Sequence, residues 1–442
     1  MPKKKTALTI EERLQQVLVP AEEQPYEVPE NWVWVRLGAI AEIVTGGTPS
    51  KKHPEYYGGN FPFYKPSDLD QGRLTYDASE YLSEEGKKVS RIIPKNSTAV
   101  CCIGSIGKCG YLMCEGTTNQ QINSAIPKIN SLCLYYYLCT ENFVQNLLSM
   151  ASATTIAIVN KSKMESCAFP LPPLSEQQRI VERIEELFAK LDEAKERLQE
   201  VADSFAVRKA AILHKAFTGE LTKQWRRENG VSDASWEEKT IGDVVLLLSG
   251  QDFPPTKYNS DGNGIPYITG ASNFDDSHVL INRWTDEPSV IAQENDVLLV
   301  CKGSGYGKTI IADFKEAHIA RQIMALRVKE VIDNYWLLYY LRNNNRFIKE
   351  QGQGLIPGLS SKVILSLSIN LPSLPEQHEI VRLIDDLLAR ERAAQQAAEQ
   401  ALASIDLIKK SILARAFRGE LGTNKASEAS ALELLKQVLA EN

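Results

Sequence analysis

The sequence lacks the features that would place it in a membrane, in an oxidising compartment or around a metal. No apolar run approaches the ~20 residues that a membrane-spanning helix needs, and no apolar stretch follows the lysines at 3–5 as it would in a signal peptide. The chain has five histidines and eight cysteines, none in a CxxC pair, so no zinc-ligand spacing is present. These absences predict a cytoplasmic protein with reduced, mostly buried thiols and no bound metal.

Signatures of catalysis are also missing. The sequence has neither the Asn/Asp-Pro-Pro-aromatic loop of a base-amino methyltransferase nor a recognisable Ser-His-Asp arrangement. Residues 303–309 (GSGYGKT) resemble a Walker A loop, but Lys302 stands where that loop needs its first glycine, and the other copy has Cys109 after its glycine and lysine. We interpret both segments as turns between strands; the alternative is a nucleotide-driven enzyme, which would have to hydrolyse ATP.

The charge balance gives little support to nucleic-acid binding by itself. The net charge is −6, with a sequence pI near 5.7. Residues 32–170 carry +2 and residues 236–370 carry −3. Any binding to DNA would therefore need local basic patches or the help of a partner.

What the sequence does contain is a long internal repeat. Residues 171–177 (LPPLSEQ) and 216–221 (AFTGEL) recur as 371–377 (LPSLPEQ) and 416–421 (AFRGEL), each at an offset of 200. The segments before them repeat as well, at offsets between 200 and 204. A repeat of this kind decides the architecture before any local pattern does.

Each repeat ends in a long helix with a heptad seam. From residue 176 to 217 the first helix would span about 63 Å at ~1.5 Å per residue, and a seam of that length needs a partner, which the second helix supplies. Glu391 interrupts the second seam, and one interpretation is that this alanine-rich stretch faces partner subunits. The seam positions are Ile180, Ile184, Leu187, Leu191, Leu198, Phe205, Ile380, Ile384, Leu387, Ile405 and Ile412.

The predicted fold is therefore α+β. Two similar globular α/β domains are separated by two long helices that form an antiparallel coiled coil, with a pseudo-two-fold internal repeat. Short helices are expected at 6–19 and 432–439, and a helical stretch at 132–148. The predicted segments are an N-terminal helix and linker (1–31), globule 1 (32–170), helix 1 (171–223), a connector (224–235), globule 2 (236–370), helix 2 (371–421) and a C-terminal tail (422–442).

Basic, aromatic and small polar residues gather in the loops of both globules. Such loops can contact phosphates through lysine and base edges through Ser, Asn and Asp, although ordinary solvated loops have a similar composition. The candidates for DNA contact are Lys51, Lys52, Tyr57, Lys65, Ser67, Asp68, Arg73, Lys108, Lys257, Tyr258, Thr269, Ser272, Asn273, Lys308 and Arg321.

Taken together, these motifs resemble the specificity (S) subunit of type I restriction–modification systems. The similarity covers roughly residues 32–421 and includes 47–50 (GTPS), 61–69 (FPFYKPSDL) and the two helix starts at 170–177 and 371–377. No single motif establishes the resemblance; it rests on the combination of motifs, which occurs twice in the same order. Thr269 stands where the first copy has Lys65, so individual DNA contacts are not transferred by the resemblance.

The resemblance implies a non-catalytic subunit with two target-recognition domains, each reading one half of a bipartite double-stranded DNA target in the major groove. It implies that the helix pair sets the unread gap, so that inserting residues near 219–222 should change it. Two methyltransferase (M) subunits and two restriction/translocase (R) subunits are the implied partners, and these would hold S-adenosylmethionine, ATP and magnesium. The alternative is a coiled-coil scaffold with two protein-binding domains and no sequence-specific DNA readout.

Overall fold

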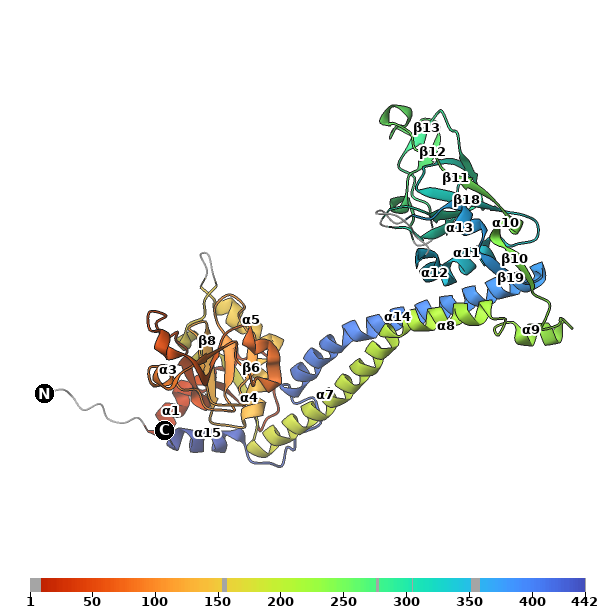
Figure 1. Ribbon diagram of the computed structural model, residues 1–442. Coiled ribbons are helices and arrows are strands. Elements are labelled where there is room, and N and C mark those ends of the chain that lie inside the picture. The colour runs from red at the N-terminus through yellow and green to blue at the C-terminus, as the bar shows by residue number, and fades with distance from the viewer. Residues whose placement is uncertain (1–8, 153–156, 276–277, 304, 351–357, 442) are drawn as a thin grey trace. The chain divides into compact units, whose positions relative to one another are not determined.

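The computed structural model describes residues 9–152, 157–275, 278–303, 305–350 and 358–441 (Figure 1). The chain forms two compact units: unit 1 comprises residues 1–197 and 401–442, and unit 2 comprises residues 198–400. Each unit contains one of the two globules and one portion of each long helix. The repeat seen in the sequence is therefore a repeat of structure as well.

Both globules are built on the same antiparallel four-stranded sheet, in the order β2–β8–β5–β6 in unit 1 and β11–β18–β15–β16 in unit 2. The strands β5 and β15 are buried along their whole length, which suits their β-branched and aliphatic side chains. The strand bounds are β2 (Ala41–Thr45), β5 (Thr98–Cys101), β6 (Cys109–Tyr111), β8 (Ile122–Pro127), β11 (Val245–Ser249), β15 (Val297–Val300), β16 (Thr309–Ile311) and β18 (Ile323–Val328).

Smaller sheets complete each globule. Unit 1 has a three-stranded sheet, β4–β3–β7, and unit 2 a four-stranded one, β13–β12–β17–β14. A two-stranded ribbon then pairs the first strand of each globule with the strand that precedes the long helix, β1 with β9 and β10 with β19. The bounds are β1 (Val33–Arg36), β3 (Tyr57–Tyr64), β4 (Glu80–Leu82), β7 (Thr117–Thr118), β9 (Ala168–Leu171), β10 (Glu237–Thr240), β12 (Ile265–Ile268), β13 (Trp284–Thr285), β14 (Ile291–Gln293), β17 (Glu316–Ile319) and β19 (Ser368–Leu371).

Short helices pack on the sheets. The helical stretch predicted at 132–148 is confirmed as α4 (Ser131–Leu138) and α5 (Glu141–Met150), and unit 2 has α11 (Asn334–Asn343) and α12 (Asn345–Glu350) at the corresponding place. Thr140 caps α5 by accepting a hydrogen bond from the backbone N–H of Phe143. The remaining short helices are α2 (Leu37–Ile40), α3 (Glu84–Lys88), α6 (Lys161–Glu165), α9 (Lys223–Glu228), α10 (Ile241–Val244) and α13 (Ser361–Leu365).

The first long helix, predicted as one element from residue 176 to 217, is divided once. It consists of α7 (Leu174–Asp203) and α8 (Phe205–Phe217), whereas the second long helix, α14 (Leu374–Ala416), is continuous over 43 residues. At the break, the Ser204 hydroxyl donates to the carbonyl of Val201 over 3.1 Å, and Arg208 donates to the same carbonyl over 3.2 Å. Side-chain bonds of this kind compete with the helical ladder.

Ion pairs within each unit confirm that the two helices run antiparallel. In unit 1 the ammonium of Lys409 lies 2.5 Å from the Asp192 carboxylate, and in unit 2 Arg208 lies 2.5 Å from Glu391. Positions late in one helix thus meet positions early in the other. The interpretation that Glu391 faces partner subunits is wrong, because its carboxylate points at the first helix.

The predicted seam serves two purposes along its length. At the helix starts, Ile180 and Ile184 are part of the apolar core of the unit 1 globule, and Ile380 and Ile384 are part of the core of unit 2. The later positions Leu187, Leu191, Leu198, Phe205 and Leu387 are half-buried, while Ile405 and Ile412 are buried. One heptad pattern therefore anchors each helix in a globule first and then continues into the helix pair.

A glutamine fixes the start of each long helix in the same way. The Gln177 amide donates to the carbonyl of Pro172 over 2.9 Å, and its oxygen accepts from the backbone N–H of Asn130 at the start of α4. In unit 2 the Gln377 amide donates to Pro372 over 2.8 Å, and its oxygen accepts from the N–H of Asp333. Because both glutamines are fully buried, these bonds set the direction in which each helix leaves its globule.

The preceding glutamate of the repeat is also fully buried. In unit 1, Glu176 accepts hydrogen bonds from the Trp32 indole at 2.7 Å, from Asn424 at 2.8 Å and from the Thr423 hydroxyl at 3.2 Å. All three donors are neutral. The segment after α14 is thereby bonded to the start of α7.

In unit 2 the equivalent carboxylate, that of Glu376, has a charged partner. It accepts from the Thr222 hydroxyl at 2.7 Å and from the Arg226 guanidinium at 2.6 Å. Arg226 also donates to the carbonyl of Gly219, which has the positive φ of +75° expected for a helix-ending glycine. The segment that follows α8 is thus bonded to the start of α14.

Both chain ends belong to unit 1. The helix α1 (Ile10–Val17) lies within the predicted helix 6–19, and α15 (Ala431–Ala440) includes the predicted run 432–439. In Figure 1 the blue helix α15 lies beside the red helix α1. Leu435 is fully buried in the unit 1 core, so the apolar face of the tail is covered within the chain itself.

Candidate nucleic-acid interface

The two glycine-lysine segments are hairpin turns, as the sequence predicted. They join β5 to β6 and β15 to β16, and Gly107 and Gly307 have φ values of +86° and +90°, which only glycine adopts easily. A Walker A loop instead leads from a strand into the N-terminus of a helix. These turns therefore present Lys108 and Lys308 at the ends of hairpins and do not form a nucleotide cradle.

In unit 1 several predicted contact residues are engaged with their neighbours. The Tyr57 hydroxyl donates to the carbonyl of Pro49 at 2.6 Å, and burial raises the pKa of this phenol. Lys65 lies 2.8 Å from Glu80, and Lys108 lies 2.6 Å from Asp70. These half-exposed ion pairs are weak enough to be exchanged for a phosphate contact.

Other unit 1 candidates differ in how accessible they are. Lys51, Lys52 and Ser67 are exposed. Arg73 lies 3.1 Å from Glu185 of α7 and 4.9 Å from the centre of the Tyr111 ring. The exposed lysines and the serine can reach a ligand, whereas Arg73 connects the globule to the long helix.

Two predicted contact residues are bonded within their own loops. The buried carboxylate of Asp68 accepts from the backbone N–H of Lys65 and of Ser79. In unit 2 the fully buried amide of Asn273 accepts from the N–H of Thr269 and donates to the carbonyl of Leu280. Every side-chain oxygen and nitrogen of these two residues is hydrogen-bonded within the protein, so both side chains hold a loop in shape.

The unit 2 candidates form a second, chemically different set. Lys257 lies 2.6 Å from Glu287, and Arg321 lies 2.6 Å from Asp252. The Tyr258 ring lies against that of Tyr267 at 5.4 Å, and the Thr269 hydroxyl is bonded to Asn273, while Ser272 is exposed. Related positions of the two units thus offer different donors and acceptors.

A buried histidine supports the loop that follows β11. His318 donates from Nε2 to the carbonyl of Gln251 at 2.9 Å, and its ring stacks on Phe253 at 4.0 Å between centres. Its Nδ1 lies 3.2 Å from the backbone N–H of Val290. Burial lowers the pKa of His318, so the neutral imidazole is the form that this environment favours.

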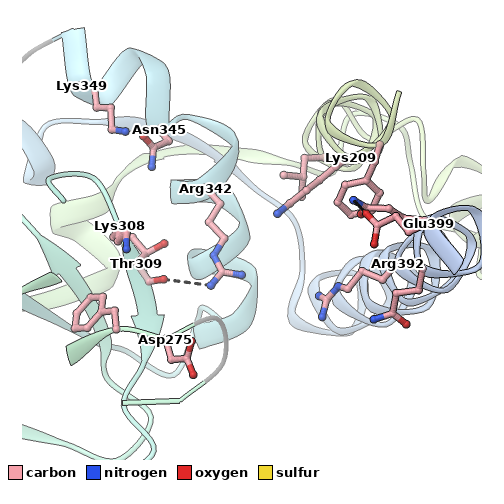
Figure 2. Close-up of a pocket in the computed structure, with 14 residues that line it drawn as sticks. Lys209, Asp275, Lys308, Thr309, Arg342, Asn345, Lys349, Arg392 and Glu399 are labelled. Carbon is pink, nitrogen blue, oxygen red and sulfur yellow. Dashed lines mark hydrogen bonds between the residues drawn. The ribbon is translucent and has the colours of Figure 1, made fainter. Parts of the chain in front are cut away.

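Unit 2 also contains a large charged cleft, with a volume of about 900 Å³, between its globule and its portion of the helix pair (Figure 2). Lys308, Arg342 and Lys349 come from the globule, and Lys209 and Arg392 from the helices. Figure 2 shows these side chains on facing walls, with Arg342 bonded to the carbonyl of Thr309 at 3.2 Å. Among the described residues that line it, two carry carboxylates, Asp275 and Glu399.

Of these five basic residues, the sequence pointed only to Lys308. The other four lie on helices, where a charge is usually a solvated surface residue. A position-by-position comparison of the two repeats would have drawn attention to Arg392, because the residue 200 positions earlier is Asp192. The tertiary structure brings the five together from four helices and the turn between β15 and β16.

Most of the thiols are buried. All eight cysteines are free, and five of them are buried, Cys101, Cys102, Cys133, Cys167 and Cys301. Burial raises the pKa of Cys102 to about 12, so its thiolate is not populated near neutral pH. Within the described ranges no group of three or more His, Cys, Asp or Glu side chains is placed to hold a metal ion, and no helix there could cross a membrane.

Comparisons with known proteins agree with this arrangement. Residues 29–203 and 234–401 match the family model of the type I restriction modification DNA specificity domain. The chain is 25% identical over 454 residues to the type I restriction enzyme StySPI specificity subunit of Salmonella potsdam (94% of this chain, 96% of the relative) and 26% identical over 460 residues to the EcoDI specificity subunit of Escherichia coli (94% and 96%). The crystal structure of the HsdS subunit from Thermoanaerobacter tengcongensis has the same fold, with a TM-score of 0.70 at 23% identity, covering 90% of this chain and 99% of that one.

Proposed function

Since the chain belongs to the type I restriction–modification DNA specificity family, we propose that its two globules each read one half of a bipartite DNA target. The observation that carries this proposal is the duplicated unit. The sheet order, the buried glutamine and the buried glutamate recur in both copies. The two units thus share the same framework of sheet and helix start, while the exposed loops on that framework differ.

The differing loops are what sequence discrimination requires. Phosphate contacts hold a protein on the duplex, but base edges must be read by side chains of distinct hydrogen-bonding character. Lys51 and Lys52 in unit 1 are cationic donors, whereas Ser272 in unit 2 both donates and accepts. Two unlike sets of loops on one framework suit a target with two unlike halves.

The long helices set the gap between the halves and hold the partner subunits. Val207 and Leu407, which are related by the repeat offset of 200, are 71% and 66% exposed on the long helices. Two apolar residues at equivalent positions support the docking of two copies of one partner. We assign these places to methyltransferase subunits, with restriction/translocase subunits completing the complex.

Catalysis resides in those partner subunits. The methyltransferase would bring S-adenosylmethionine, and the translocase would bring ATP and magnesium. This chain supplies the sequence information and the spacing.

The test is a comparison of genome-wide adenine methylation between the host and a strain in which this chain is deleted. We expect a split methylated motif that disappears on deletion and returns with the intact gene. A variant with the exposed residues Lys51 and Lys52 changed to alanine should weaken methylation at that motif while leaving the purified complex assembled. If every methylated motif persists in the deletion strain, the proposal is wrong and a protein-binding scaffold becomes the better interpretation.

A further inference from the structure

Each long helix begins at a joint where another segment of the chain docks on it, and the two joints are built alike. In the tail joint of unit 1, the Thr423 hydroxyl donates to Glu176 at the start of α7 over 3.2 Å. In the connector joint of unit 2, the Thr222 hydroxyl donates to Glu376 at the start of α14 over 2.7 Å. If this bond were the only contact, either segment would fit either helix start.

In the tail joint the helix start supplies a cation. The Arg179 guanidinium of α7 donates to both carboxylate oxygens of Glu428, over 2.9 and 2.8 Å, and to the carbonyl of Thr423 over 3.0 Å. The position related to Arg179 on α14 holds Glu379. A tail docked on the start of α14 would therefore place Glu428 against a second carboxylate, so that an attraction is replaced by a repulsion.

In the connector joint the docking segment supplies the cation. The buried Arg226 guanidinium donates to Glu376 over 2.6 Å and to the Thr222 hydroxyl over 3.1 Å. Thr222 is the counterpart of Thr423, whose carbonyl Arg179 contacts in unit 1. A connector docked on the start of α7 would therefore bring the guanidinium groups of Arg226 and Arg179 to the same threonine, where they repel each other.

The helix pair contains a second distinction between the halves of the chain. Arg208 of α8 and Glu391 of α14 form an ion pair of 2.5 Å in unit 2, whereas the related positions in unit 1 hold Ile408 and Leu191. If two copies of the first long helix paired with each other, Arg208 would meet Leu191. If two copies of α14 paired, Glu391 would meet Ile408. Each charge would lose its partner, and a polar residue at one position of an apolar seam selects helix partners in this way.

We propose that these polar contacts admit the unlike half of the same chain and reject the like half of a second copy. The first half is globule 1 with α7 and α8, and the second half is globule 2 with α14. In an exchanged dimer, first halves would pair with first halves and second halves with second halves, and both joints would then hold like charges. The contacts thus keep two different globules together in one monomeric chain. The apolar docking of α15 on unit 1 is the competing basis for this choice.

The test co-expresses two copies of the full chain, each with a different affinity tag, and leaves α15 unchanged. Arg179→Glu with Glu428→Arg keeps the attraction in the tail joint but gives both helix starts a carboxylate. Arg208→Ile with Glu391→Leu installs in unit 2 the residues that unit 1 has, so the change has a precedent in the same molecule. Purification through one tag should recover about tenfold more of the second copy from the combined variant than from the wild type, with the mass of two chains.

Arg183→Glu with Glu186→Arg is the matched control. It reverses an ion pair of 2.8 Å on α7, but both residues belong to that one helix, so the pair does not distinguish the two halves. We expect the recovery of the second copy to match that of the wild type. Each of the two double substitutions made alone should give an intermediate recovery, because one distinction is retained.

Two results would overturn the inference. One is a wild type that already recovers as much of the second copy as the combined variant. The other is a combined variant with the helix content of the wild type that recovers no more than the control, since α15 would then decide the pairing. If the combined variant does not fold, the two double substitutions made separately decide the question, and wild-type recovery in both overturns it. None of these results bears on the proposed function, because the methylation test uses the unaltered chain.

Discussion

The length of the helices between the two units should determine the unread gap in the DNA target. We consider a heptad inserted into both helices, between residues 197 and 198 and between residues 400 and 401, where one unit ends and the other begins. Duplicating residues 191–197 and 394–400 supplies the inserts from the chain's own helices. Seven residues preserve the heptad seam and leave the rotation only ~20° short of two full turns.

The expected size of the effect follows from helix and DNA geometry. Seven residues at ~1.5 Å lengthen each helix by about 10.5 Å. At ~3.4 Å per base pair this corresponds to about three base pairs. The contacts that hold each unit together, among them Asp192–Lys409 and Arg208–Glu391, lie on one side of the insertion points or the other and are retained.

The assay is again the mapping of methylated adenines, now in cells that carry the double insertion. We expect both half-sites to keep their sequences while the gap between them grows by about three base pairs. The control is the same insertion in α7 alone, which leaves the helices unequal in length and should reduce assembly and methylation. An assembled, active double variant with an unchanged gap would refute the idea that the helices measure distance.

The insertion point suggested by the sequence, near residues 219–222, is a poor choice in the structure. The Gly219 carbonyl and the Thr222 hydroxyl belong to the buried network around Glu376. An insertion there would break hydrogen bonds inside unit 2 and would not simply lengthen the helices. The unit boundaries are the better place because both lie within a long helix and away from this buried network.

Three further predictions concern stability. Arg226→Met removes the charged partner of the buried Glu376 carboxylate and should destabilise unit 2 by about 3–5 kcal/mol in urea unfolding. Arg227→Met, at the exposed neighbouring position, should have almost no effect. Equal losses in the two variants would show that Arg226 does not stabilise the buried carboxylate. Burial lowers the pKa of His318 below its ordinary 6.5, so near that pH the native state binds fewer protons than the unfolded chain. The contribution of the neutral His318 to the free energy of unfolding is therefore complete above pH 6.5 and is lost as the pH falls. The melting temperature should drop less between about pH 7 and pH 5 in His318→Gln than in the wild type. Leu435→Ala in α15 should cost about 2–5 kcal/mol of unit 1 stability, seen as a lower melting temperature for that unit alone, and an unchanged melt would show that the tail does not contribute to the core.

Much of the fold could be predicted because its signals are local and occur twice. The offset of 200, the heptad spacing and the glycine turns are properties of neighbouring residues, and they led to two globules, two long helices and an antiparallel pairing. The break at Ser204 was not predicted, because side-chain bonds to one backbone carbonyl do not disturb a seven-residue period in the sequence. The role of Glu391 escaped it for a similar reason, since a charge in an apolar seam is explained only by its partner, Arg208, 183 residues away.

The candidate interface was predicted less well than the fold. Loop composition pointed to exposed residues such as Lys51 and Lys308, but it also pointed to Asp68 and Asn273, which use the same polar atoms to hold their own loops. Composition does not distinguish a polar group that faces solvent from one that is hydrogen-bonded to the backbone, because the difference lies in where each atom points. The helical side of the cleft could not be predicted from a loop pattern at all.

The sequence by itself determined that this protein contains two similar globules and two long helices and lacks the motifs of an enzyme, because periodicity and repetition are properties of the order of residues along the chain. Only the tertiary structure decided which charges meet. It bonded the segment after α14 to the start of α7 in unit 1, and it gathered five basic side chains from four helices and a hairpin turn of unit 2 around one cleft. The physical reason is that an electrostatic interaction depends on distance in space, and residues such as Lys209 and Arg392 come close only when the chain has folded.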